Sequence, residues 1–256
     1  MEKFEKTFDN AAADYDQSRP AYVKGIYRDI FDYQPIGQDS RVLEIGLGTG
    51  KAAGPILETG CRFVGLEPGE NLGALARERF RGYGNFSLCS QTFQDYVCPA
   101  GSFDLIYAAT AFHWIPEEYG YPKVYDFLKP GGIFARFAYH AGVDRGRGVL
   151  TEEIQGLYRE YMGRESRPTQ FGEEDAKQLA EKALAYGFTD VKYALYHDTK
   201  DFTAQEYMSL LRTYSDHMKL EPAARKGLFD GIFHAIQRHG GLITVYYTMD
   251  LELARK

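Results

Sequence analysis

Three alternating glycines directly after an apolar run are the residues of this chain with the clearest chemical use. They lie in the segment Arg41-Val-Leu-Glu-Ile-Gly46-Leu47-Gly48-Thr-Gly50. Glycine adopts positive φ and lets a ligand approach the backbone closely. The apolar run is typical of a buried strand, and residues 51–59 are expected to open a helix whose first N–H groups point at the turn. Such a turn at the carboxyl edge of a parallel sheet holds a cofactor.

The spacing of the glycines and the charge beside them indicate which cofactor this is. The dinucleotide fingerprint G-x-G-x-x-G needs a glycine where the chain has Lys51, so the turn reads G-x-G-x-G instead. Glu44 precedes the first glycine and would repel a pyrophosphate, but it would attract an ammonium or sulfonium group. S-adenosylmethionine carries both cations. It is therefore favoured over a nicotinamide cofactor, and an NAD(P)-dependent oxidoreductase is the alternative.

A second acid follows the next apolar run. The run over residues 61–67 ends in Glu67, and Pro68 and Gly69 then interrupt the strand. A carboxylate about 20 residues after the glycines is where a ribose-binding acid is expected. The simpler alternative is a solvated acid at the end of a strand. We expect Glu67, with Pro68 beside it, to bind the nucleoside.

Five motifs in one order make the chain resemble the class I S-adenosylmethionine-dependent methyltransferases, in particular the small-molecule type with a methyltransferase-11-like core. The motifs are Val42–Gly50, Val64–Gly69, Ser90–Asp95, Phe103–Trp114 and Leu128–Ile133. The resemblance implies S-adenosylmethionine as cofactor and S-adenosylhomocysteine as its product. It also implies a doubly wound, mostly parallel, seven-stranded Rossmann-like sheet with an antiparallel last strand, and inserted helices that form a cap.

The N-terminal segment is similar to the lid of this family. It reads Phe8-x-x-Ala11-x-x-Tyr15-x-x-x-Arg19-Pro-x-Tyr22. The resemblance implies that Tyr15 and Arg19 close over the cofactor and that Arg19 meets its carboxylate. The alternative for both residues is an ordinary surface position at the end of a helix.

The loop after the third strand departs from the family. Relatives usually place an acid there to accept the adenine amino group, whereas this chain offers Gln91, Thr92 and Phe93. The N–H near Phe93 can donate to an adenine ring nitrogen, and the Phe93 ring can stack on adenine. Gln91 or Thr92 then replaces the carboxylate as acceptor of the adenine amino group. Ala109, at the end of the fourth strand, is also expected to contact the cofactor.

The segment Ala109-Thr-Ala-Phe-His113-Trp114 is the best candidate for chemistry, because it projects from the carboxyl end of a central strand. Methyl transfer is an in-line displacement that depends mainly on positioning. His113 can take a proton from an oxygen or nitrogen nucleophile, or it can merely orient Trp114 or cap the next helix. Trp114, Tyr139 and His140 are expected to face the substrate, with packing or loop roles as the alternative.

Composition and charge limit the classes of partner that the chain can bind. The chain of 256 residues has a formal net charge of −6, which argues against a nucleic-acid binder. The tip of the fourth strand is not Asn-Pro-Pro-Tyr, and no His/Cys/Asp spacing suggests a metal.

Three cysteines without C-x-x-C spacing, a polar start and no membrane-length apolar run favour a cytoplasmic protein. We expect a small-molecule acceptor, no nucleic acid, no membrane and no metal. A non-catalytic S-adenosylmethionine-binding regulator stays a further alternative, and the sequence does not indicate the oligomeric state.

Strands and helices must alternate to position these residues. Apolar spacing predicts a helix over 20–34 and alternating strands and helices to residue 138. Beyond it, helices are expected around 154–162, 179–187, 207–218 and 228–236, and strands over 191–197 and 243–253. The last strand alternates apolar and polar residues, which predicts one solvated or partly covered face. The expected domains are lid helices 1–36, a core 37–138, a helical insertion 139–190, and further core 191–256 with inserted helices 202–239.

Overall fold

The computed structural model describes residue 9 and residues 12–143, 148–164 and 171–256. Phe8 and Ala11 of the expected lid motif lie outside these residues. The chain forms two compact units. The sheet unit contains Ala21–Tyr139, Phe171–Tyr196 and Met249–Lys256, and the helical unit contains Met1–Pro20, His140–Gln170 and His197–Thr248.

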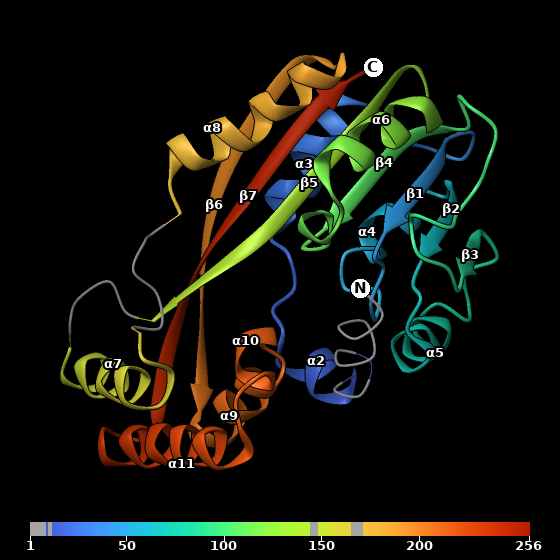
Figure 1. Ribbon diagram of the computed structural model, residues 1–256. Coiled ribbons are helices and arrows are strands. Elements are labelled where there is room, and N and C mark those ends of the chain that lie inside the picture. Colours follow the sequence, from blue (N-terminus) through green and yellow to red (C-terminus); the bar gives the residue numbers. More distant parts are fainter. Residues whose placement is uncertain (1–8, 10–11, 144–147, 165–170) are drawn as a thin grey trace. The chain divides into compact units, whose positions relative to one another are not determined.

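The strands of the described residues form one sheet in the order β3-β2-β1-β4-β5-β7-β6 (Figure 1). Their bounds are β1 (Arg41–Ile45), β2 (Arg62–Leu66), β3 (Phe86–Cys89), β4 (Phe103–Ala109), β5 (Leu128–Val143), β6 (Thr189–Thr203) and β7 (Leu242–Arg255). The pairs β1/β2, β1/β4, β2/β3 and β4/β5 are parallel. β7 is antiparallel to β5, because the Gly131 N–H donates to the Lys256 carbonyl and the Lys256 N–H donates to the Gly132 carbonyl. The expected fold class is confirmed.

The strand order reverses between β1 and β4. These two strands are neighbours in the sheet, although β2 and β3 lie between them in the sequence. Open α/β sheets bind ligands outside the carboxyl ends of their strands at such a switch point. The glycine turn follows β1 there, and residues 110–114 follow β4.

Helices cover both faces of the sheet in the sheet unit. On one face, α3 (Lys24–Tyr33) buries Ile26, Tyr27, Ile30 and Tyr33, which share one side of a helix. The predicted helix over 20–34 is confirmed, although it begins later because Val23 is extended. The other helices of this unit are α4 (Gly54–Leu57), α5 (Glu70–Arg79), α6 (Glu117–Phe127) and α8 (Glu173–Glu181), with the 3-10 turns η1 (Phe112–Trp114) and η2 (Lys182–Tyr186).

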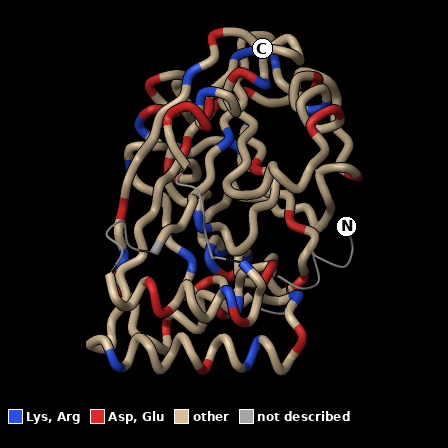
Figure 2. Tube along the Cα trace, turned by 60° about the vertical axis from the view of Figure 1, so that its left-hand side comes forward, with Lys and Arg blue, Asp and Glu red and all other residues tan. Residues whose placement is uncertain are grey.

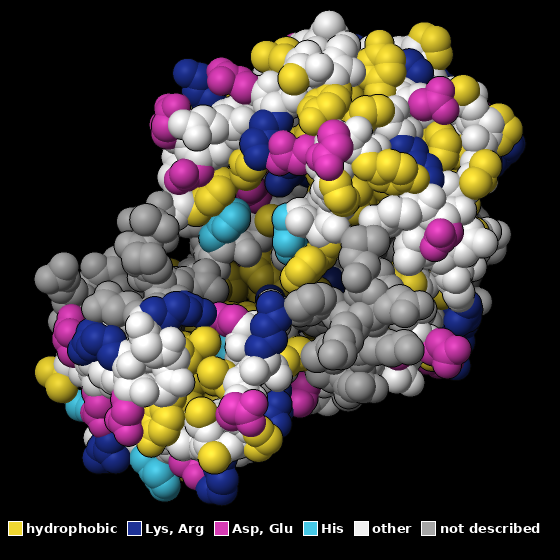
Figure 3. Space-filling view, viewed as in Figure 1, with side chains coloured by type: hydrophobic (Ala, Val, Ile, Leu, Met, Phe, Trp, Pro, Cys, Tyr) yellow, Lys and Arg dark blue, Asp and Glu magenta, His cyan; other side chains and the backbone are white. Residues whose placement is uncertain are grey.

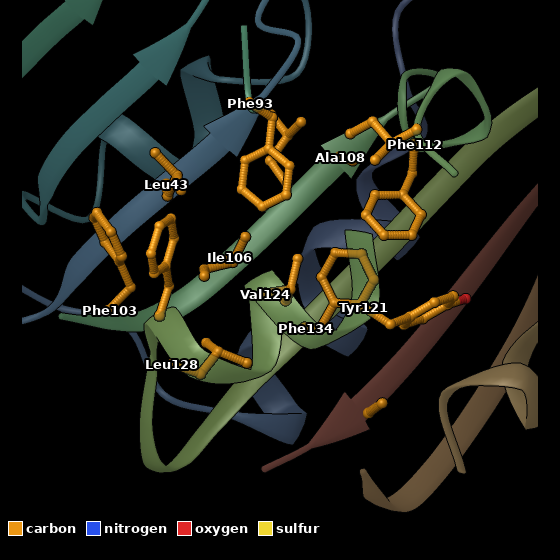
Figure 4. Packing of buried hydrophobic residues seen from close by; sticks show 14 of the residues in the cluster. Leu43, Phe93, Phe103, Ile106, Ala108, Phe112, Tyr121, Val124, Leu128 and Phe134 are labelled. Carbon is orange, nitrogen blue, oxygen red and sulfur yellow. The ribbon is translucent and has the colours of Figure 1, made fainter. Parts of the chain in front are cut away.

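On the opposite face, α6 and η1 pack on β1, β4 and β5 in one buried cluster (Figure 4). Phe112 is its anchor at the end of β4. Its ring centroid lies 4.8 Å from that of Phe134 and 5.1 Å from that of Tyr121. Burying an aromatic side chain of this size stabilises the fold by roughly 1.5–3 kcal/mol. The core therefore fixes the turn that carries His113 and Trp114.

The predicted solvated face of the last strand is wrong for the end of β7. Asp250 and Glu252 lie on that polar face, yet both are buried. Both side chains meet groups of the neighbouring strand β5 rather than water. The Ala138 N–H donates to the Asp250 carboxylate, and the Arg136 guanidinium pairs with Glu252 at 3.2 Å. The alternation of apolar and polar residues at the end of β7 therefore corresponds to a buried polar cluster rather than to a solvated face.

The helical unit contains α2 (Ala12–Ser18), α7 (Val149–Met162), α9 (Ala204–Arg212), α10 (Ser215–Met218) and α11 (Pro222–Arg238). α11 packs against α7 and α9, and α2 packs against α9. The predicted continuous helix over 207–218 is wrong, because α9 ends at Arg212 and α10 begins at Ser215. Thr213 lies in this break, where its hydroxyl donates to the Leu210 carbonyl.

Candidate active site

The glycine turn after β1 has positive φ at each of its glycines, +70° at Gly46, +58° at Gly48 and +81° at Gly50. Packing requires the two outer ones. A Cβ at Gly46 would lie 2.6 Å from the Cβ of Ala111, and a Cβ at Gly50 would lie 2.3 Å from the ring of Phe80. Gly46 therefore lets the turn touch the segment after β4, and Gly50 lets it touch the end of α5.

Leu47 takes part in this turn through its backbone. Its side chain is buried, and it packs so closely on β2 that a Cβ at Gly65 would lie 2.7 Å from it. Its N–H donates to the Leu66 carbonyl at 2.8 Å. The side chain of Leu47 thus belongs to the core, and a ligand can meet only the main chain at this position.

Glu67 joins the turn after β1 to the turn after β2. One carboxylate oxygen accepts the Gly48 N–H at 2.8 Å, and the other accepts the Gly69 N–H at 2.8 Å. Glu67 is 6% exposed, and the half-buried Pro68 follows it in the sequence. Each carboxylate oxygen accepts up to two hydrogen bonds. Both oxygens can therefore hold ribose hydroxyls while the backbone N–H groups fix their position.

Glu44 lies inside the sheet beneath the turn. It is 1% exposed, and the Tyr107 hydroxyl donates to its Oε2 at 2.7 Å. Burial raises the pKa of the Glu44 carboxyl well above its usual range, the Tyr107 hydrogen bond opposes this, and the charge of Glu67 adds to it. A cation bound above the turn would favour the ionised form. Glu44 is thus placed to interact with a ligand by charge rather than by surface contact.

These residues fit the cofactor expected from the sequence. Two buried acids and a turn without side chains at three positions suit a nucleoside with a cationic group. A pyrophosphate would meet carboxylates where it needs N–H donors.

The loop after β3 differs from the expectation in one respect. The ring of Phe93 is 3% exposed and lies in the core, with its centroid 6.1 Å from that of Phe127, so it cannot stack on adenine (Figure 4). Its N–H stays a candidate donor. The Thr92 hydroxyl donates to the Asp95 carboxylate at 2.7 Å and accepts the Asp95 N–H at 3.1 Å. Asp95, three residues beyond Thr92 in the sequence, therefore brings an acid to this loop that our sequence reasoning did not select.

Thr110, in the segment after β4, pairs with Tyr22, and our sequence reasoning selected neither residue for the site. Ala109 ends β4 in register with Phe137 of β5. Thr110 follows with φ +54°, and its N–H donates to the Phe137 carbonyl at 2.7 Å. The hydroxyls of Thr110 and Tyr22 lie 2.7 Å apart. Tyr22 belongs to the lid motif and Thr110 to the segment favoured for chemistry, but nothing in the sequence pairs the two residues.

His113 and Trp114 follow on η1, and both are exposed. Their ring centroids lie 4.9 Å apart, and Trp114 is 42% exposed. Tyr139 lies near this edge too, with its ring centroid 5.9 Å from that of Tyr22. The sheet unit thus brings the glycine turn, Glu67 and Thr110 to the carboxyl ends of β1, β2 and β4, and Tyr139 lies within β5, two residues beyond the partner of Ala109.

Tyr15, Arg19 and His140 belong to the helical unit. The Arg19 Nε donates to the Thr213 hydroxyl at 2.8 Å, and its Nη2 donates to the Thr213 carbonyl at 2.7 Å. The guanidinium carbon lies 4.6 Å from the ring centroid of Tyr214 and 5.3 Å from that of Tyr15. The break between α9 and α10 therefore holds one edge of Arg19.

Charged residues of both signs intermingle along the chain and on the face seen in space-filling view (Figures 2 and 3). Within the described ranges, no group of three or more His, Cys, Asp or Glu side chains could hold a metal ion. A helix with the length and apolar character to cross a membrane is likewise not found in the part of the chain that the structure describes.

Comparisons with known proteins agree on one family. A family profile described as a methyltransferase domain matches residues 42–132. An uncharacterised methyltransferase of Anoxybacillus flavithermus is 30% identical over 178 residues, covering 61% of this chain and 82% of the relative. One of Schizosaccharomyces pombe is 24% identical over 225 residues, covering 84% and 81%.

Solved structures share the fold. A structure titled as a type II methyltransferase from Anaeromyxobacter dehalogenans is 20% identical, with a TM-score of 0.67, and covers 93% of this chain and 97% of its own. Phosphoethanolamine N-methyltransferase 2 of Haemonchus contortus, solved with phosphomonomethylethanolamine and S-adenosylhomocysteine, is 18% identical, with a TM-score of 0.54. It covers 97% of this chain and 57% of its own.

Proposed function

The chain belongs to the class I S-adenosylmethionine-dependent methyltransferases, and we propose that it methylates an oxygen or nitrogen atom of a small molecule. As a member of this family it is an enzyme that uses S-adenosylmethionine. The observation that carries the proposal is the pairing of Glu67 with the N–H groups of Gly48 and Gly69, which joins the glycine turn to the acid after β2.

Residues of the sheet unit would hold the nucleoside. We propose that Glu67 accepts the ribose hydroxyls, that the main chain of Leu47 and Gly48 contacts the amino-acid part, and that the loop from Thr92 to Asp95 contacts adenine. When bound, S-adenosylmethionine supplies an electrophilic methyl group on a sulfur that is its own leaving group. Glu44 lies in a low-dielectric interior, where its charge would favour this cation over a neutral nucleoside.

Arg19 and Tyr15 are proposed to bind the carboxylate end of the cofactor. Thr213 holds the Nε and Nη2 edge of the Arg19 guanidinium, which fixes its plane for bidentate recognition of a carboxylate. Tyr15 and Tyr214 flank the same guanidinium.

His113 is the proposed base for the acceptor. It is exposed on η1, next to Trp114 and directly after the tip of β4. A base in this place would take the proton that an oxygen or nitrogen nucleophile loses, which typically adds about 10²–10⁴-fold to a rate. Trp114, Tyr139 and His140 are proposed to contact the acceptor.

The proposed acceptor is a small molecule rather than nucleic acid. The net charge of −6 gives no general attraction for a polyanion. Among the structural neighbours, the Haemonchus contortus enzyme is named for a small phosphoamine, which supports an amine among the acceptors to be tried. We propose a cytoplasmic location, which the free cysteines Cys61, Cys89 and Cys98 support.

Two measurements test this function. Titration calorimetry with S-adenosylhomocysteine and with NAD should give binding of the first and none of the second. The protein is then incubated with methyl-labelled S-adenosylmethionine and a metabolite extract, and labelled products are identified by mass spectrometry. A labelled small molecule is the expected result. Binding of S-adenosylhomocysteine without any labelled small molecule would refute small-molecule methylation, and binding of NAD alone would refute the cofactor site as well.

The variant His113→Gln separates a base from a packing role. It removes the titratable ring and keeps a polar side chain of similar size. If His113 is the base, product formation falls by about 10²–10⁴-fold and the affinity for S-adenosylhomocysteine stays unchanged. A rate within a few-fold of the unmodified protein would exclude His113 as the base.

A further inference from the structure

Thr110 has a backbone conformation that its residue type disfavours. Its φ is +54°, in the left-handed region, and it is a β-branched residue. Outside glycine this region is used mainly by Asn and Asp, so a threonine there is strained. Such strain persists only where the surrounding structure determines it, and it gathers at functional sites. Thr110 is thus a candidate for a role that the proposed function has not used.

Two hydrogen bonds hold Thr110 in place. Its N–H donates to the Phe137 carbonyl at 2.7 Å, which extends the β4–β5 ladder by one residue. Its Oγ1 lies 2.7 Å from the Tyr22 hydroxyl. The ring of Tyr22 is fixed in turn, because it meets the Phe137 ring edge-on with centroids 4.8 Å apart. The Thr110 side chain therefore points toward Tyr22 at the carboxyl edge of the sheet.

This hydroxyl pair lies next to the cofactor turn. The residue after Thr110 is Ala111, whose Cβ is so close to Gly46 that a Cβ there would lie 2.6 Å away. Ala108, two residues before Thr110, pairs with Ile45, the residue before the turn. Thr110 thus lies at the point where β1, which leads into the cofactor turn, runs beside β4, which leads into the candidate acceptor site.

We propose that the Thr110 hydroxyl binds the acceptor at its nucleophilic atom and that Tyr22 is the positioning residue for Thr110. In this proposal the Tyr22 phenol, the stronger acid of the two, is the donor of the hydrogen bond between the two hydroxyls. A second lone pair of the Thr110 oxygen can accept one N–H of an amine nucleophile, and a second N–H is left for the proposed base His113. The nucleophile then points its own lone pair away from Thr110. The chemistry favours an uncharged amine as the acceptor group. The inference rests on the proposed function, because it requires an acceptor.

The test compares Thr110→Val, Thr110→Ser and Tyr22→Phe. Valine keeps the shape and the β-branching of threonine and loses the hydroxyl, whereas serine keeps the hydroxyl. The probes are methyl-labelled S-adenosylmethionine and the extract fraction that the unmodified protein methylates. We expect transfer to fall roughly tenfold or more in Thr110→Val, as for a lost hydrogen bond to substrate, and to stay within a few-fold in Thr110→Ser. Tyr22→Phe should lie between them and should raise KM for the fraction.

Two measurements distinguish an acceptor role from a packing role. The affinity for S-adenosylhomocysteine, measured by calorimetry, should stay within about twofold in all three variants. Thr189→Val is the matched control, since its hydroxyl donates to the Arg255 carbonyl in an exposed part of the same unit. It should leave transfer unchanged.

Each contrary outcome has its own meaning. Full transfer by Thr110→Val overturns the inference and leaves the proposed function intact. Equal losses of transfer and of S-adenosylhomocysteine affinity also overturn it, because Thr110 would then support the cofactor turn. If the unmodified protein binds S-adenosylhomocysteine but labels no small molecule, the proposed function fails, and the acceptor role of Thr110 fails with it.

Discussion

Alanine at each glycine of the cofactor turn should separate the packing needs of this turn from its ligand needs. Gly46 and Gly50 allow close contacts, with Ala111 and with the ring of Phe80 respectively. Gly48 lies between them and donates its N–H to Glu67, the acid proposed to hold the ribose. We therefore expect Gly46→Ala and Gly50→Ala to affect mainly stability, and Gly48→Ala to affect mainly cofactor affinity.

The magnitudes follow from the backbone and the contacts. An alanine with positive φ costs about 1–2 kcal/mol, and φ lies between +58° and +81° at the three positions. A Cβ at 46 would lie 2.6 Å from the Ala111 Cβ, and one at 50 would lie 2.3 Å from Phe80. Overpacking of this kind adds roughly 1–3 kcal/mol. Gly46→Ala and Gly50→Ala should thus lower the free energy of unfolding by about 2–5 kcal/mol, and Gly48→Ala by about 1–2 kcal/mol.

Denaturant unfolding gives the stabilities, and calorimetry with S-adenosylhomocysteine gives the affinities. Gly48→Ala should stay folded and bind at least about tenfold more weakly, which is about 1.4 kcal/mol. Gly82→Ala is the matched control, because a Cβ at Gly82 would have no described neighbour within 4 Å and its φ is not positive. It should change neither stability nor affinity by more than a few tenths of a kcal/mol, or should stabilise slightly.

Two results would refute this reasoning. Unchanged affinity in Gly48→Ala would mean that the cofactor does not approach the backbone at this turn. Unchanged stability in Gly46→Ala would mean that the segment after β4 does not pack on the turn as described, and the position of Ala111 would then need revision.

The remaining predictions concern buried or anchored charges. Burial raises the pKa of the Glu44 carboxyl well above its ordinary value of 4.5. The folded protein therefore binds more protons than the unfolded chain above that pH, and its stability falls as the pH rises through the folded pKa. Glu44→Gln should flatten this slope in unfolding measured from pH 5 to 8, and an unchanged slope would reject Glu44 as its origin. Arg136→Met leaves the buried Glu252 without its cation, so it should destabilise by about 3–5 kcal/mol in urea unfolding, and a loss below 1 kcal/mol would contradict the pairing. Thr213→Val removes the acceptor of the Arg19 Nε and should weaken S-adenosylhomocysteine binding several-fold. Thr213→Ser keeps the hydroxyl and should bind as the unmodified protein does. Equal affinities of the valine and serine variants would argue against a cofactor role of Arg19.

Local patterns predicted the cofactor turn and the strands that lead into it. The three glycines have positive φ, as the strand-to-helix turn requires, and Glu67 ends up within hydrogen-bond distance of Gly48 although it is 19 residues away in the sequence. Both features depend on short stretches of chain whose geometry is set by residue type. A right-handed crossover between parallel neighbours then brings the ends of β1 and β2 together without further information.

Burial was less accessible to sequence reasoning. The alternation in β7 indicates which residues are polar, but it does not indicate whether a partner covers them. Asp250 and Glu252 are buried because Arg136 and the Ala138 N–H lie opposite them on β5, more than 100 residues earlier in the sequence. The ring of Phe93 was misassigned for the same reason, since its neighbour Phe127 lies on α6. Each case depends on a contact between distant segments, and one sequence does not specify such contacts.

The pair of Thr110 and Tyr22 marks the limit of prediction most clearly. The two residues are 88 positions apart in the sequence, and the feature that singles them out is a backbone angle. A residue type that fits its local conformation gives a signal in the sequence, as the glycines do. A threonine with φ +54° opposes its own local preference, so local reasoning predicts the wrong conformation there. If Thr110 binds the acceptor, the residue that determines specificity is the one whose sequence signal is misleading. Thr110→Gly tests this, because glycine relieves the strain and loses the hydroxyl. It should unfold no more easily than the unmodified protein and should transfer methyl groups more slowly, whereas a clear loss of stability would show that the threonine serves the fold.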